Sequence, residues 1–213
     1  TGVGMMECKK ALTEADGDMD KAVDFLRERG LAAAQKKAAR IAAEGIVLSY
    51  SDDAAKKGVV IEVNSETDFV AKNEKFVDFV TDCAKTIIAT GVSTVEELAA
   101  AEYMGTGRTV AETLNDLILA IGENMKIRRF EVMDGVLATY VHAGGSVGVM
   151  VGFDVADDSK AATAEFKDMG KNVAMQVAAM SPAYLDEASV PEEIIAHEKS
   201  ILASQMKEDP KMA

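Results

Sequence analysis

Few residues of this 213-residue chain have the types and spacing that covalent chemistry requires. His142 lies in the segment Tyr140-Val141-His142-Ala143-Gly144-Gly145, with no Gly-x-Ser-x-Gly elbow or cysteine nucleophile near it in the sequence. The simpler interpretation is a histidine at a hairpin turn. The segment Gly144–Gly148 is superficially like a phosphate-binding loop, but it joins two predicted strands and lacks both the Walker lysine and a following helix. This pattern favours a tight turn.

The sequence predicts neither a metal site nor a cofactor. The two histidines and two cysteines form no His-x-x-x-His motif and no Cys/His cluster with the spacing of metal ligands. Cys8 and Cys83 lie at apolar positions of predicted helices, which indicates buried thiols. Without a Cys-x-x-Cys motif or a signal-peptide pattern, these cysteines favour the cytoplasm, or an organelle matrix, over secretion.

Two apolar segments could instead bind another protein. Thr67-Asp68-Phe69-Val70 connects a predicted hairpin to a long helix, a place where loops present side chains. In one interpretation, Thr67 or Asp68 caps that helix and Phe69 packs down as a hydrophobic staple. In the other, Phe69 protrudes beside a carboxylate and fills a pocket of a partner. Met5-Met6 could likewise be core filler or an adaptable contact surface.

Composition limits the classes of partner. The chain is 48% hydrophobic and 28% charged, as globular proteins are, and no run approaches the ~20 apolar residues of a membrane helix. A disordered chain and a transmembrane chain are therefore excluded by the sequence. The net charge of −13 would repel phosphate backbones, so we expect no direct nucleic-acid partner. With no apolar run of membrane length, we expect no membrane partner either.

Apolar periodicity and turn residues place the elements that must position these segments. Apolar stripes predict a helical hairpin over 1–30, whose second helix spans 19–29, with Asp18 as its cap and Gly30 at its end. The alanine-rich segment 31–45 has a helix-favouring composition and is predicted as a linker. The later predicted elements are strands 46–50 and 59–63, a helix from Phe76 to Ile88, helices opened by the capping boxes Ser93-x-x-Glu96 and Thr109-x-x-Glu112, strands 127–133, 136–141 and 147–153, a helix over 160–180, and a last helix capped by Ser189-Val190-Pro191-Glu192 with Ile194, Ile195, Ile201 and Leu202 inward.

The sequence repeats itself at an offset of 90 residues. Glu44–Tyr50 matches Asp134–Tyr140, Gly58–Ile61 matches Gly148–Val151, and Phe76 matches Phe166. A register without gaps across two strands and a helix predicts a hairpin-plus-helix unit that is used twice. Phe69 has only Ser159 opposite it, so the shared fold does not require this aromatic side chain.

The predicted fold class is therefore α+β, with two repeated subdomains that each pack helices on a small antiparallel sheet. The domain boundaries follow the repeat: a helical module over 1–30, a linker over 31–45, a first core subdomain over 46–132 and a second over 133–213.

Three separated motifs resemble those of the elongation factor Ts family. They are Gly4-Met5-Met6-Glu7-Cys8-Lys9-Lys10-Ala11-Leu12 with the following Gly17-Asp18, Thr67-Asp68-Phe69-Val70-Ala71-Lys72-Asn73, and Gly122-Glu123-Asn124-x-x-Ile127-Arg128-Arg129. The resemblance covers nearly the whole chain and keeps the motifs in order. It implies a ubiquitin-associated-like N-terminal module, of which one preceding helix is missing here, and family members often continue past Ala213.

This resemblance also implies a function: nucleotide exchange on the GTPase elongation factor Tu, without covalent catalysis. The Asp68-Phe69 pair would act as a wedge that disturbs Mg²⁺ and phosphate binding in the partner, and Thr67 and Val70 would belong to the same exchange motif. Met5, Met6 and His142 would bind the partner. From the residues alone, two other classes stay open: a general interaction module built on the helical hairpin, and a small enzyme that uses His142 with a nearby carboxylate.

Overall fold

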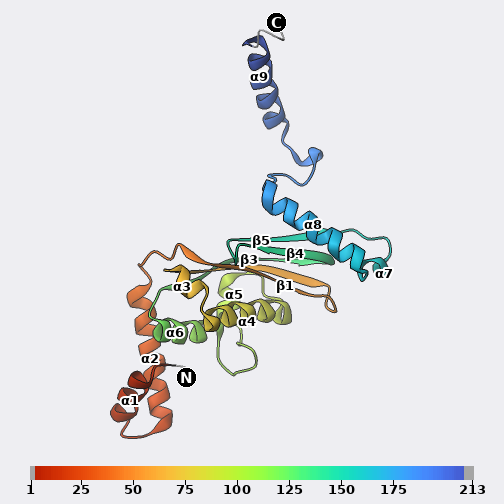
Figure 1. Ribbon diagram of the computed structural model, residues 1–213. Coiled ribbons are helices and arrows are strands. Elements are labelled where there is room, and N and C mark those ends of the chain that lie inside the picture. The colour runs from red at the N-terminus through yellow and green to blue at the C-terminus, as the bar shows by residue number, and fades with distance from the viewer. Residues whose placement is uncertain (1–2, 209–213) are drawn as a thin grey trace. The chain divides into compact units, whose positions relative to one another are not determined.

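The computed structural model describes residues 3–208 (Figure 1). Its helices and strands follow one another in this order: α1 (Met5–Glu14), α2 (Met19–Lys37), β1 (Glu44–Asp52), β2 (Lys57–Ser65), α3 (Asp68–Ala71), α4 (Glu74–Thr90), α5 (Val95–Ala100), α6 (Val110–Ile121), β3 (Met125–Asp134), β4 (Val136–His142), β5 (Val147–Phe153), α7 (Asp158–Ala161), α8 (Ala164–Met180), the 3₁₀ turn η1 (Glu187–Ser189) and α9 (Glu192–Glu208). The chain divides into a compact first unit that ends at Ala178 and a second that begins at Ala179.

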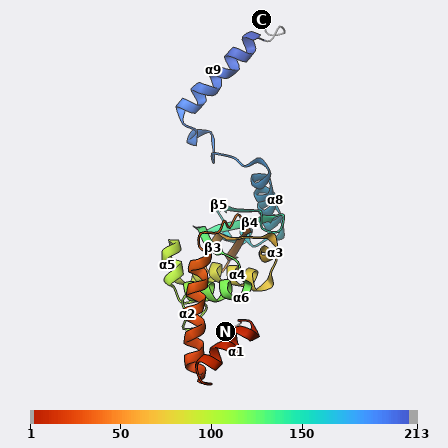
Figure 2. The same ribbon diagram turned by 90° about the vertical axis from the view of Figure 1, so that its left-hand side faces the viewer.

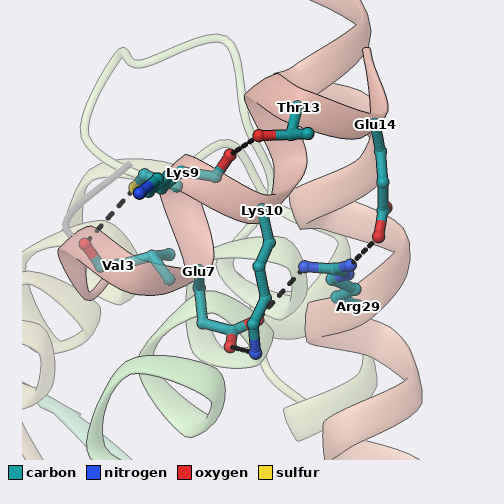
Figure 3. Close-up of polar contacts among 8 residues, drawn as sticks. Val3, Glu7, Lys9, Lys10, Thr13, Glu14 and Arg29 are labelled. Atoms are coloured by element: carbon teal, nitrogen blue, oxygen red, sulfur yellow. Dashed lines mark hydrogen bonds and ion pairs between the residues drawn. The ribbon is translucent and has the colours of Figure 1, made fainter. Parts of the chain in front are cut away.

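α1 and α2 form the predicted helical hairpin. Their shared core is small and consists mainly of alanines with Leu26. Arg29 of α2 ties the two helices together, because its guanidinium donates to Glu7 at 3.2 Å and to Glu14 at 2.6 Å (Figure 3). Asp18 caps α2 as predicted, since its carboxylate accepts from two backbone N–H groups of the first turn.

The predicted end of this second helix at Gly30 is wrong. α2 continues through Gly30 to Lys37, and Gly30 is buried against α6. A Cβ atom at residue 30 would lie 3.3 Å from both the Asn115 carbonyl oxygen and Asp116 Oδ1. Glycine is therefore present for a close approach between two helices, a role that single-helix patterns do not distinguish from a helix end.

The first sheet is antiparallel, in the order β1-β2-β3, and α4 covers one of its faces. Val59, Ile61 and Val63 alternate along β2 and are fully buried against this helix layer. α4 contributes the other half of the core through the predicted apolar stripe, which runs from Phe76 to Ile87. α6 also packs on α4 and meets α2 on another side, so the N-terminal hairpin is joined to the core.

The second sheet is the antiparallel pair β4-β5, which packs on the first sheet (Figures 1 and 2). The β4–β5 turn lies against the start of β1, where the Val47 N–H donates to the Gly145 carbonyl at 2.7 Å. α8 packs on this second pair through Gly170, whose added Cβ would lie 2.9 Å from Ala138 Cβ. In Figure 1 the first unit thus has α4 and α6 beneath the first sheet and α8 above the second.

The structure confirms the repeat and the α+β class. α3 and α7 begin 90 residues apart and have four residues each, and α4 and α8 also begin 90 residues apart with 17 residues each. Both copies place these two helices after an antiparallel hairpin. The predicted domain boundaries stay a prediction. The chain divides after residue 178, so the boundary predicted between residues 132 and 133 lies inside the first unit, which contains both sheets.

Two local predictions require correction. The capping box of α5 is Thr94 with Glu97, one residue later than predicted, because the Thr94 hydroxyl accepts from the Glu97 N–H and the Glu97 carboxylate accepts from the Thr94 N–H. In α9, Ile194, Ile201 and Leu202 are exposed instead of inward, and Ile195 is half-buried. Ser189 does not cap α9: it belongs to η1, where its hydroxyl donates to Asp186. The box Thr109–Glu112 is confirmed.

Candidate interaction site

The Thr67–Val70 segment lies between β2 and α4, where the short helix α3 makes a single turn. α3 is anchored to the core, because the side chains of Val70 and Ala71 are buried there. Phe69 points the other way, and 82% of its surface is exposed. The helix therefore places one large aromatic side chain in solvent on a well-anchored turn.

The structure overturns the staple interpretation of this segment. A staple would bury Phe69, and Thr67 makes no side-chain cap to α3. The cap of α4 is instead Asn73, whose side-chain oxygen accepts from the Lys75 N–H. Neither helix capping nor core packing therefore explains why an aromatic residue stands at position 69.

Asp68 directly precedes Phe69 in the chain. Its carboxylate accepts a 2.8 Å hydrogen bond from Lys72, one turn further along the chain. This bond and the attraction of the ammonium group lower the pKa of Asp68 below its ordinary value. The site thus carries an ionised carboxylate next to an apolar ring.

Sequence reasoning assigned no role to the residues that hold this segment. Glu123 accepts hydrogen bonds from both the backbone N–H and the hydroxyl of Thr67. Asn124 donates its backbone N–H to Glu66, at 2.6 Å. The only sequence signal was that Glu123 and Asn124 lie in a motif with a family resemblance, and more than 50 positions separate each of them from its partner.

His142 is exposed at the end of β4, and its Nδ1 lies 2.9 Å from the Tyr140 hydroxyl. The glycine-rich segment after it is the tight turn that the sequence predicts, and this turn packs on Ile46. Ile46 lies near the start of β1, which pairs with the end of β2 just before α3. The structure therefore brings His142 and Phe69 to the same end of the two sheets.

Met5 and Met6 are not part of that end of the molecule. They lie on α1, which packs on α2 below α6 in Figure 1, whereas α3 lies above α6. Their side chains are 86% and 64% exposed, so the interpretation as core filler is wrong. They form a separate exposed apolar pair.

Comparison with known proteins decides the family. A model of the family described as "Elongation factor TS" matches residues 66–213. Elongation factor Ts of Clostridium novyi (strain NT) is 51% identical over 209 residues, which cover 96% of this chain and 67% of that protein. The proteins of the same name from Clostridium perfringens (strain SM101 / Type A) and Magnetococcus marinus (strain ATCC BAA-1437 / JCM 17883 / MC-1) are 50% and 48% identical, with the same coverage.

The chain belongs to the elongation factor Ts family.

The matched range of this elongation factor Ts domain contains Thr67–Val70, Glu123 and His142. Met5 and Met6 lie before the range that the family model matches. The alignment to the Clostridium novyi protein is longer and covers 96% of the chain.

Among residues 3–208, no three side chains of His, Cys, Asp or Glu gather as a metal site would require. Burial raises the pKa of the Cys83 thiol far above its ordinary value, so it is not a thiolate nucleophile. None of the described helices is long and apolar enough to cross a membrane.

Proposed function

We propose that this chain accelerates the release of GDP from elongation factor Tu, with Phe69 as an apolar wedge and Asp68 beside it. Nucleotide exchange on elongation factor Tu is the general role of the elongation factor Ts family, to which the chain belongs. The observation that carries the proposal is the 82% exposure of Phe69 on a turn whose backbone is anchored.

An exchange factor works by linkage between two binding sites. A protein that binds elongation factor Tu better when its nucleotide is loose must loosen that nucleotide by the same factor. Phe69 would enter a pocket between helices of the GTPase domain, and Asp68 would lie near the displaced helix. The shift weakens the coordination of Mg²⁺ and the hold on the β-phosphate, on which nucleotide binding depends. No covalent bond is made or broken.

The energies involved are of the right order. Burying a phenylalanine side chain contributes roughly 1.5–3 kcal/mol, and coupling between two binding sites is typically about 1–3 kcal/mol. Phe69 starts almost fully in water, so nearly all of its apolar surface is available for burial against the partner. One ring can therefore supply much of the coupling.

Met5 and Met6 form a second contact with elongation factor Tu in this proposal. His142 also belongs to the interface with elongation factor Tu. The two methionines are flexible apolar side chains in solvent, which suits a contact surface that adapts to its partner. The proposal requires no cofactor and no nucleic acid. It places the exchange in the cytoplasm or an organelle matrix.

Stopped-flow release of a fluorescent GDP analogue from elongation factor Tu tests the proposal. We expect the wild-type chain to accelerate release and Phe69→Ala to lower that rate by roughly tenfold or more, as the loss of a buried aromatic anchor would. Ser159→Ala, at the matching position of the second repeat, is the control. With this variant, elongation factor Tu should release GDP as fast as with the wild-type chain.

Normal release by Phe69→Ala, with an unchanged circular dichroism spectrum, would rule out the wedge. If the wild-type chain fails to accelerate release at all, exchange itself is the wrong function for this chain.

A further inference from the structure

Thr67, directly before Asp68-Phe69, is held by side chains from outside α3. Its backbone N–H donates to Glu123 Oε2 at 3.0 Å, and its hydroxyl donates to Glu123 Oε1 at 2.7 Å. Its carbonyl oxygen accepts from the Ser65 hydroxyl at 2.9 Å. All three polar groups of one residue are therefore fixed by hydrogen bonds, two of them to a single carboxylate.

The second repeat solves the same local problem differently. There, Asp157 occupies the position of Thr67, and its carboxylate accepts from the Ser159 N–H at 2.9 Å, as an ordinary helix cap does. Thr67 makes no such cap, and its hydroxyl instead donates to Glu123. The first copy has replaced a local cap by an anchor 56 positions away in sequence.

Glu123 is itself well placed to act as an anchor. It follows Gly122, whose left-handed backbone ends α6. The next residue, Asn124, is 8% exposed and donates its backbone N–H to Glu66 and its side-chain amide to the Arg40 carbonyl. Two consecutive residues after α6 thus hold two consecutive residues before α3.

A single helical turn needs such support. A turn of four residues is unstable by itself, because nucleation fixes several dihedral angles for one hydrogen bond. A mobile turn would lose conformational entropy when Phe69 enters a partner, whereas a turn that is already ordered loses much less.

We propose that Glu123 is a positioning residue for exchange: through Thr67 it holds α3 in the orientation that presents Phe69 to the partner. The inference rests on the proposed function, and it adds that the rate of exchange depends on a carboxylate that does not touch the nucleotide.

The experiment combines two measurements on the full chain. Amide hydrogen exchange over residues 66–72 reports the order of the segment without any partner, and stopped-flow GDP release reports exchange. The variants are Glu123→Ala, the gentler Thr67→Val, which removes only the hydroxyl, Phe69→Ala, and the double variant Glu123→Ala with Phe69→Ala.

Glu97→Ala is the matched control. Glu97 also accepts several hydrogen bonds at a helix start, from the Ser93 N–H and hydroxyl and from the Thr94 N–H. It lies in the first turn of α5, which Figure 2 shows on the opposite side of the first unit from α3. Its loss should affect stability in a similar way without affecting the segment.

We expect Glu123→Ala to speed amide exchange over 66–72 and to lower the rate of GDP release roughly tenfold, the effect of losing a hydrogen bond to a charged acceptor. Thr67→Val should give a smaller change of the same kind. In the Phe69→Ala background, Glu123→Ala should change the release rate no further, because it acts through Phe69.

Unchanged amide exchange in both Glu123→Ala and Thr67→Val would overturn the anchor. Full, independent effects of Glu123→Ala and Phe69→Ala on release would also overturn it, since Glu123 would then act elsewhere. Faster amide exchange combined with normal release by Phe69→Ala would leave the anchor standing and refute the wedge, so the two failures are distinguishable.

Discussion

Phe69 and Phe76 show how little the type of a residue says about its place. Phe76 is fully buried beneath the first sheet, whereas Phe69, seven positions earlier, is 82% exposed. The internal repeat of the sequence already distinguishes them: Phe166 matches Phe76, but Ser159 stands opposite Phe69. An apolar residue that both copies keep serves the shared core, and one that a single copy carries needs another explanation.

At the same scale, Asp68→Ala should lower the rate of GDP release less than Phe69→Ala does, because the apolar ring remains. Asp68 is exposed and paired only one turn away with Lys72, so its loss should leave the melting temperature nearly unchanged. Thermal unfolding and stopped-flow release measure the two effects. A variant that loses mainly thermal stability would show that this carboxylate supports α3 instead of the partner contact.

At the scale of elements, local capping signals predicted the starts of two helices, α2 and α6. Asp18 and the Thr109–Glu112 box were found from sequence because a cap is a local hydrogen bond within a few residues. The end of α2 was missed because Gly30 is buried against the backbone of α6, more than 80 positions away. The residue pattern of one helix does not indicate which other helix packs across it.

The α6 cap makes stability depend on pH. A hydrogen bond from the Thr109 N–H is the largest cause that lowers the pKa of Glu112, with help from Arg27 and Arg108. Because the folded pKa lies below the ordinary value of 4.5, the ionised carboxylate stabilises the fold above pH 4.5. That contribution is lost as the pH falls below 4.5 through the lower folded value.

Glu112→Gln should therefore flatten the dependence of the free energy of unfolding on pH in this acidic range, as chemical denaturation at a series of pH values would measure. Glu96→Gln, at an exposed glutamate of α5, is the control. An equal slope in wild type and Glu112→Gln would contradict the assignment.

At the scale of the whole first unit, the two sheets meet through close backbone approaches. Gly145, with φ of 111°, packs its Cα on Ile46, where an added Cβ would lie 2.9 Å from Ile46 Cβ. Its carbonyl accepts from Val47 across the junction. This contact also fixes the turn that carries His142.

Gly145→Ala should lower the free energy of unfolding by about 3 kcal/mol, because both the left-handed backbone and the crowding at Ile46 oppose a Cβ atom. Gly144→Ala is the matched control: its φ of 67° is also left-handed, but nothing lies within 4 Å of the added atom. We expect a cost of about 1–2 kcal/mol there. Similar losses in both variants would show that the junction tolerates the extra atom.

The sequence by itself determined the repeated α+β core, its strands, the caps of α2 and α6, and two apolar segments as candidates for binding. These features follow from apolar periodicity and turn residues, which are local, and from the comparison of the two repeats within the sequence. Only the tertiary structure decided that Phe69 and the two N-terminal methionines lie in solvent, and that Glu123 holds Thr67. Exposure and anchoring depend on which distant segments pack together, and a spacing of 56 positions leaves no mark in the pattern of either segment.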